Sequence, residues 1–171
     1  LPRYFYQSYS VPVAGQFEIC IKEQIKLLNL FTKKAKNITK IKLVSPKKLG
    51  WELDKFFLKN GYGANIIKNN LNFTQNANNC RLSVHTHNAT TFIETLEANF
   101  PTILYLNKRY YELRDSSKGI FDELMRVKIF FDNIEETSCF INQNYNDIEK
   151  WWYDDSLQKV RKKFLSEYAI S

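Results

Sequence analysis

Cysteine, glycine, proline, methionine and histidine are all scarce in this chain of 171 residues. The three cysteines, Cys20, Cys80 and Cys139, are widely separated, and an odd number without short spacings excludes a disulfide framework and a zinc knuckle. We expect three buried free thiols. Five glycines and four prolines form no linker-like or low-complexity segment, and no apolar run is long enough to span a membrane.

The first residues also lack the charged start and apolar core of a signal peptide. The chain begins with Leu1 instead of methionine, so we expect a segment of a longer cytoplasmic protein. A hydrophobic content of 44% and an aromatic content of 15% are sufficient for a core and argue against global disorder. We therefore expect residues 1–171 to form a single lobe.

Positive charge is present and unevenly distributed. Residues 22–59 contain eleven lysines and three acidic residues, a net charge of +8 against +7 for the whole chain. This excess suggests an anionic partner, such as a phosphorylated substrate, an anionic lipid surface or nucleic acid, or else a solvated face. We rank nucleic acid last because no aromatic platform alternates with the lysines.

Strand-like and helix-like periods alternate along the chain. Helices are predicted over residues 15–34, 51–58, 90–99, 111–126, 134–150 and 155–168, with a weak helical turn at 72–79. Strands are predicted over residues 41–44, 64–67, 81–85 and 101–106. This rhythm predicts an α/β fold of the Rossmann type: a parallel sheet with helices on both faces and a helical tail over 150–171. Such sheets bind ligands at the carboxyl ends of their strands.

Both histidines, His85 and His87, fall at the end of one predicted strand. Residues i and i+2 of a strand point to the same face, as zinc ligands do, but no third ligand is recognisable nearby. The sequence therefore predicts no metal. Each histidine either lines the ligand cleft, where it could donate to a phosphate, or is an ordinary hydrogen-bonded side chain.

The next residues predict a helix start at the same edge of the sheet. Asn88, Thr90 or Thr91 could cap this helix, and its first N–H groups, from Ala89 onward, would form an anion site. Glu94 lies one turn further in, where its carboxylate could accept hydrogen bonds from ribose hydroxyls. An ordinary capped helix, with Glu94 only favouring the helix dipole, fits the same residues.

The segment 94–101, in which Glu94 stands seven residues before Pro101, resembles part of the donor lobe of two-lobed (GT-B) glycosyltransferases. A closer match covers nearly the whole chain: it resembles the carboxyl-terminal half of the LIC-type O-antigen family of transferases. The matching pieces are residues 2–4, 9–14, 50–51, 88–94, 101–103, 111–114, 121–122, 151–152, 160–164 and Tyr168. Their order and spacing, more than any single piece, carry the resemblance.

The resemblance implies a sugar nucleotide as substrate, no tightly bound cofactor and no metal requirement. The product would be a bacterial surface polysaccharide such as O-antigen or capsule. A glycan or lipid-linked acceptor, and the general base, would belong to an amino-terminal lobe. Residues 1–171 alone would then bind nucleotide weakly and catalyse no transfer. A place at the inner face of the membrane, by peripheral association, would suit such an acceptor.

One residue departs from the family pattern: Ala89 stands where relatives often have glycine. Alanine does not readily adopt positive φ, so a tight phosphate cradle is expected to be looser here. The catalytic candidates are Arg3, which would enter the interlobe cleft and clamp phosphate or a sugar carboxylate, and the histidines named above. Glu112 and Arg114 follow the strand at 101–106 and either contact a ligand or pair with each other.

Other motifs favour structural roles. Trp151 and Trp152 are typical of packing, and Asp154 with Asp155 is typical of a helix cap. Two rival functions fit less well. A sugar-nucleotide 2-epimerase shares the fold and the Glu-to-Pro spacing but needs more acids and bases in the cleft. A non-catalytic module would bind anionic polymer or lipid through the lysine-rich third.

Overall fold

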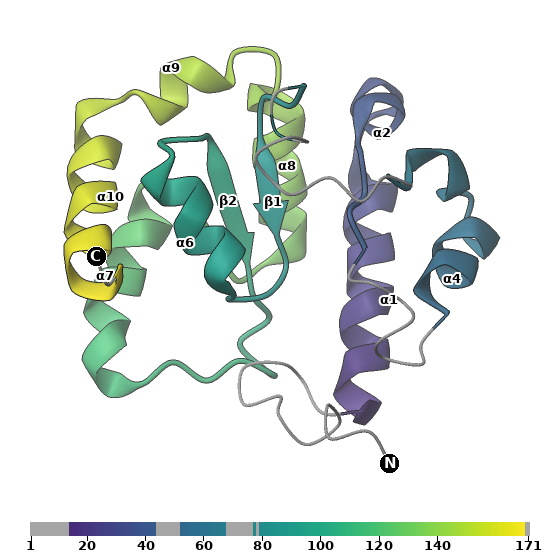
Figure 1. Cartoon of the computed structure of the whole chain (residues 1–171), viewed down its shortest axis with the longest axis horizontal. Coiled ribbons are helices and arrows are strands. Elements are labelled where there is room, and N and C mark those ends of the chain that lie inside the picture. Colours follow the sequence, from purple (N-terminus) through teal and green to yellow (C-terminus); the bar gives the residue numbers. More distant parts are fainter. Residues whose placement is uncertain (1–13, 44–51, 68–76, 78, 170–171) are drawn as a thin grey trace.

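Three parallel strands lie at the centre of the computed structural model, which describes residues 14–43, 52–67, 77 and 79–169 (Figure 1). They are β1 (Ser83–His85), β2 (Thr102–Tyr105) and β3 (Phe130–Phe131), in the order β1-β2-β3. His85 is in register with Leu104, and Leu104 is in register with Phe130. The central strand, β2, has four buried residues, as expected for a strand of a covered parallel sheet.

Helices cover both faces of this sheet. Ile103 and Tyr105 of β2 pack with residues of α1 (Ala14–Leu30) and α8 (Ile134–Asn144). The alternating residues, Leu104 and Leu106, pack with α6 (Thr90–Glu97), α7 (Asp115–Arg126) and α10 (Asp155–Tyr168). The two-residue period of a strand thus separates two hydrophobic cores. The predicted Rossmann-like α/β fold, with helices on both faces, is confirmed.

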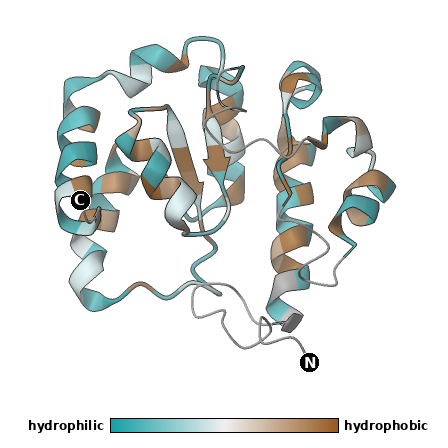
Figure 2. Cartoon of the chain, in the orientation of Figure 1, coloured by the Kyte–Doolittle hydropathy of each residue, from teal (hydrophilic) through white to brown (hydrophobic). Residues whose placement is uncertain are grey.

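Apolar residues concentrate in the strands and along one side of the surrounding helices (Figure 2). In α10, Leu157, Val160 and Phe164 recur at helical spacing and are all at most 5% exposed. Asp154 caps this helix, as expected, because its carboxylate accepts from the N–H groups of Ser156 and Leu157.

The strand β3 was not predicted. It contains only Phe130 and Phe131, between Lys128 and Asp132, and two residues are too few to show a strand period. The helix predicted over 134–150 is also wrong in part. It consists of α8 and a separate short helix, α9 (Ile148–Trp152), because asparagine-rich residues form a turn between them.

The helix predicted over 15–34 ends early, at Leu30, and a second helix follows. In this helix, α2 (Lys33–Ile38), the Thr32 hydroxyl caps the first turn by accepting from Ala35 N at 3.2 Å. The side chain of Asn142, on α8, fills the junction. Its Oδ1 accepts from Thr32 N and its Nδ2 donates to Leu30 O, both at 2.9 Å.

Two predicted strands, 41–44 and 64–67, are reduced to one parallel bridge between Ile41 and Ile66. Residues Gly63–Asn65 form a 3-10 helix, η2, which prevents a longer ladder. The helix predicted at 51–58 appears as α4 (Leu53–Lys59). Val44, Trp51 and most of the turn predicted at 72–79 lie outside the described residues.

Trp151 and Trp152 both pack, as predicted. Trp152 is fully buried, and its Nε1 donates to Asn99 O at 3.0 Å, while Trp151 Nε1 donates to Val127 O at 2.9 Å. They join the carboxyl-terminal helices to the loops that enter β2 and β3. Asn99 has a φ of 51°, in the left-handed region that asparagine tolerates.

Candidate functional site

The loops that follow β1 and β2 form the carboxyl edge of the sheet, where Rossmann-like folds bind ligands. Helix α1 lies beside this edge, and two adjacent residues of α1 contact the two loops. Gln24 Nε2 donates to Thr86 Oγ1 at 2.7 Å, directly after β1. Glu23 Oε1 accepts from Nδ2 of Asn107, two residues after β2, at 2.5 Å. One turn of α1 therefore holds both loops in place.

Glu23 places a carboxylate at this edge. One of its oxygens, Oε1, contacts Asn107, and the other, Oε2, lies 3.5 Å from the hydroxyl of Tyr105. Burial and the nearby Glu23 charge raise the pKa of the Tyr105 hydroxyl, so it stays protonated and can only donate to the carboxylate. Burial, and secondarily Glu23, raise the pKa of the Cys20 thiol to about 11, which keeps this cysteine protonated at neutral pH.

His85 is buried between β1 and α6. It is 8% exposed, and its Nε2 lies 2.9 Å from Ser83 Oγ and 3.3 Å from Thr95 Oγ1. Its ring meets that of Phe92 edge-on, with 5.8 Å between centroids. Burial, and secondarily His87, lower the pKa of His85 to about 4, so this imidazole is neutral at pH 7.

His87, two residues later, is partly exposed in the loop after β1. Burial lowers its pKa too, so it is also neutral at pH 7 and has both a donor and an acceptor nitrogen. Of the two histidines, His87 is therefore the one that a ligand at this edge could reach.

The helix start at 88–91 differs from the prediction. The cap residue of α6 is Ala89, with a φ of −136° and a ψ of 169°, and no side chain caps the helix. The predicted caps, Asn88, Thr90 and Thr91, are therefore wrong. Extended φ is open to any residue, so alanine imposes no strain at this position. The N–H groups of the first turn carry the positive end of the helix dipole.

Glu94, one turn into α6, is exposed. Asn88 and Thr90 are exposed as well, and Thr91 is partly exposed, so these side chains are accessible at the carboxyl edge of β1. Arg3 lies outside the described residues.

The helix predicted over 111–126 would have included Glu112 and Arg114, but neither residue lies on a helix. Helix α7 begins at Asp115, and Arg114 is extended with a φ of −61° and a ψ of 145°. The reason is that Tyr111 and Leu113, two residues apart, both pack against the α6–α7–α10 core, which requires extended backbone. Glu112 and Arg114 are both exposed, and no ion pair joins these two described residues.

Sequence reasoning missed Glu23, Gln24 and Asn107. The apolar spacing of α1 identified its buried face but carried no information on which polar residues face the sheet edge. Asn107 directly follows a strand, and this position was the only available signal. The cysteines form no disulfide, but the expected burial is wrong, since Cys139 is exposed and the other two are partly exposed.

Within the described ranges, no group of three histidine, cysteine or acidic residues could hold a metal ion. None of the described helices combines the length and apolarity needed to cross a bilayer.

Fold and site together define a Rossmann-like α/β protein with polar groups gathered at the carboxyl edge of its sheet. The model of a protein family, described as LIC12162 family transferase, matches residues 1–171. The chain belongs to this family of transferases. No curated protein and no solved structure matches the chain.

Proposed function

We propose that this transferase binds a sugar nucleotide at the carboxyl edge of β1 and transfers its sugar. The observation that carries the proposal is the start of α6. It has no side-chain cap, and the exposed Glu94 follows within the next turn. Backbone N–H groups at a helix start suit a diphosphate, and a carboxylate nearby suits ribose hydroxyls. The resemblance of residues 94–101 to the donor lobe of GT-B glycosyltransferases supports the same assignment.

In this mechanism the first turn of α6 stabilises the negative charge that develops on the departing nucleotide phosphate. A neutral His87 could donate a hydrogen bond to the same group. Glu23 and Gln24 keep the loops after β1 and β2 in position through Asn107 and Thr86. A glycan or lipid-linked acceptor, with its general base, would be supplied by a second lobe, as in surface polysaccharide synthesis.

The test is a thermal-shift screen with UDP-, GDP-, dTDP-, CMP- and ADP-linked sugars, followed by calorimetry on any donor that binds. We expect at least one donor to bind, and Glu94→Ala to weaken it at least tenfold. The matched control is Glu97→Ala, an exposed glutamate at the other end of α6, which should leave the affinity unchanged. A donor that binds Glu94→Ala as tightly as the unchanged protein would refute the ribose assignment.

A second measurement separates transfer from epimerisation. In a chain that carries both lobes, nucleotide release that depends on an acceptor indicates a transferase acting on that acceptor. Release without any acceptor would instead favour the 2-epimerase. Residues 1–171 alone are expected to bind donor and to release no nucleotide enzymatically.

A further inference from the structure

A cavity lies beside β1, and Gln24 and Thr86 of the sheet edge are among the residues that line it. Its volume is about 640 Å³, within the range of small-molecule sites. Residues 38–42 form one wall and β1 forms the other, with α1, α2 and α8 around them.

The inner wall of the cavity is aliphatic and aromatic. It is formed by Leu27, Leu28, Phe31, Ile41, Val84 and Ile141. The neutral polar side chains among them already have partners: Gln24 bonds Thr86, and Thr39 Oγ1 donates to Ala35 O at 2.7 Å. These internal hydrogen bonds engage part of the capacity of both side chains, and the rest of the inner wall offers no hydrogen-bonding group to a base. The wall therefore favours an aliphatic ligand over a nucleoside.

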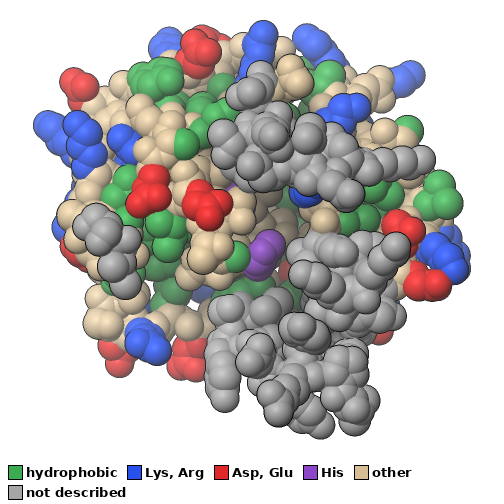
Figure 3. Space-filling view, viewed as in Figure 1, with side chains coloured by type: hydrophobic (Ala, Val, Ile, Leu, Met, Phe, Trp, Pro, Cys, Tyr) green, Lys and Arg blue, Asp and Glu red, His purple; other side chains and the backbone are tan. Residues whose placement is uncertain are grey.

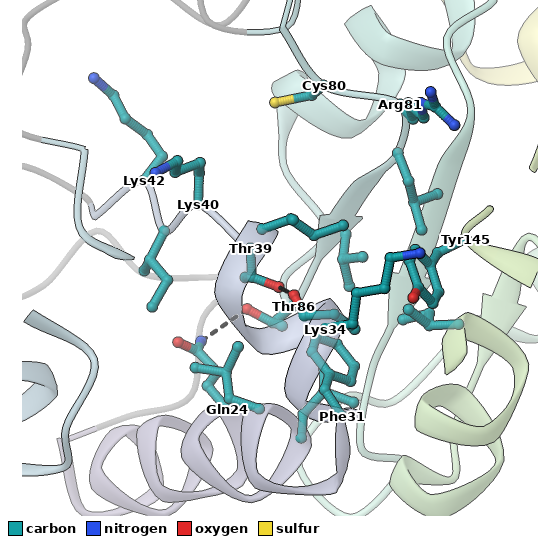
Figure 4. A pocket seen from close by; sticks show the side chains of 18 of the residues that line it. Gln24, Phe31, Lys34, Thr39, Lys40, Lys42, Cys80, Arg81, Thr86 and Tyr145 are labelled. Carbon is teal, nitrogen blue, oxygen red and sulfur yellow. Dashed lines mark hydrogen bonds between the residues drawn. The ribbon is translucent and has the colours of Figure 1, made fainter. Parts of the chain in front are cut away.

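The charged residues of the cavity are all basic. Lys34, Lys40, Lys42 and Arg81 line it, and no aspartate or glutamate appears among its described lining residues. Figure 4 shows Lys40 and Lys42 on one side and Arg81 on the other, with Lys34 extending toward Tyr145. On the face shown in Figure 3, by contrast, acidic and basic side chains are mixed around the perimeter.

Two of these cations converge on one neutral residue. Lys34 Nζ donates to Asn146 Oδ1, and Arg81 Nη1 donates to Asn146 O, each at 3.3 Å. Lys34 also lies 5.8 Å from the centre of the Tyr145 ring. Neither cation forms a salt bridge with a described carboxylate. An anion bound between them would therefore meet two cations that no described acid pairs with.

We propose that this cavity binds an anionic amphiphile, with an aliphatic chain against the inner wall and a phosphate or carboxylate head between Lys34 and Arg81. The ligand class follows from charge complementarity at one end of the cavity and apolar surface along the rest. Lys34 and Arg81 are not part of the proposed donor site at the start of α6, although the Gln24–Thr86 pair of the sheet edge also lines the cavity.

Calorimetry on the full chain tests the proposal, with dodecyl phosphate and dodecanoate used below their micelle concentrations. We expect at least one to bind saturably, and the head group that binds more tightly identifies the anion. Inorganic phosphate, butyl phosphate and the uncharged dodecyl maltoside should all bind at least tenfold more weakly. Equal binding of inorganic phosphate or of dodecyl maltoside would overturn the amphiphile assignment, as would no binding of either dodecyl anion.

The double variant Lys34→Glu/Arg81→Glu should weaken the dodecyl anion at least tenfold. The matched control is Lys159→Glu/Lys162→Glu, which makes the same charge change at two exposed lysines of α10, on the far side of the sheet (Figure 1). Equal loss in the control would show non-specific attraction and overturn the site. Thermal melting confirms that both variants fold, and wild-type affinity in the first variant would also overturn the proposal.

The donor screen keeps this result distinct from the proposed function. Lys34→Glu/Arg81→Glu should retain sugar-nucleotide binding, whereas Glu94→Ala should retain dodecyl-anion binding. If the Lys34 and Arg81 substitutions abolish nucleotide binding instead, the cavity is a nucleotide site and the amphiphile proposal is wrong.

Discussion

At the scale of single residues, His85 shows how one position in a motif can serve the fold while its neighbour stays accessible. The His-x-His pattern suggested two equivalent side chains on one face of a strand. In the structure, α6 covers His85, and Ser83 and Thr95 contact its ring. His87 lies beyond the strand, in the loop. Which of the two would be covered depends on where α6 packs, and this long-range packing was not visible in the local pattern.

The buried His85 makes stability depend on pH. Its folded pKa of about 4 lies below the unfolded value of 6.5, so the unfolded chain binds a proton that the folded chain does not. Stability is therefore full above pH 6.5 and falls as pH decreases toward 4. Between pH 7 and pH 5 we expect this residue to lower the free energy of unfolding by about 2 kcal/mol.

Urea unfolding of His85→Gln and His87→Gln at pH 7 and pH 5 measures this effect. Glutamine does not titrate, so His85→Gln should lose most of the pH dependence. His87→Gln should retain more of it, since His87 is less buried than His85. An unchanged pH dependence in His85→Gln would show that other groups cause the acid sensitivity.

At the scale of elements, helices with a clear apolar face were predicted well and short strands were not. The spacing of Leu157, Val160 and Phe164 identified α10 because an amphipathic helix repeats its pattern over many residues. β3 contains only two residues, and the bridge between Ile41 and Ile66 pairs a single residue from each segment. Such short strands are set by neighbouring strands and helices, so local sequence contains little information on them.

Two glycines provide a matched test of helix and turn geometry. Gly119 lies inside α7, is exposed, and a Cβ there would meet no atom within 4 Å. Gly119→Ala should therefore stabilise the protein by about 0.5–1 kcal/mol, because alanine loses less entropy in a helix. Gly61 also has open space but a φ of 87°, so Gly61→Ala should destabilise it by about 1–2 kcal/mol.

Thermal or chemical unfolding of both variants would provide the measurement. The two sites differ in backbone conformation and not in the space around the added methyl group. Shifts of the same sign would therefore mean that φ does not decide the outcome.

At the scale of the whole molecule, the sequence was sufficient for the fold class and insufficient for the site. Alternation of helices and strands predicted the Rossmann-like arrangement, which the sheet and its two cores confirm. The contact between Glu23 and Asn107 joins residues 84 positions apart, and no local period reports such a pair. The cavity beside β1 likewise depends on a strand that forms only one bridge.

Hydrogen exchange should reveal unequal stability across the molecule. The amides of Leu104 and Leu106 donate to Ile129 O and Phe131 O, and β2 lies between the two cores. We expect them to exchange most slowly, near the rate set by global unfolding. Helix α4 includes Leu58, which is 65% exposed, and should exchange faster. Equal protection of α4 and β2 in peptide mass spectrometry would indicate one cooperative unit.

The junction of α1 and α2 has a consequence for mutational tolerance. The Asn142 amide accepts from one backbone group and donates to another, so both ends of a single short side chain are in use. Aspartate has the same size but lacks the donor, and it would place a carboxylate oxygen against the Leu30 carbonyl. The partner groups belong to the backbone, so substitutions at Leu30 or Thr32 preserve them. Substitution of Asn142 on α8 therefore removes these hydrogen bonds. Leu30 and Thr32 contribute only backbone groups to them, so their side chains can vary without losing these two bonds.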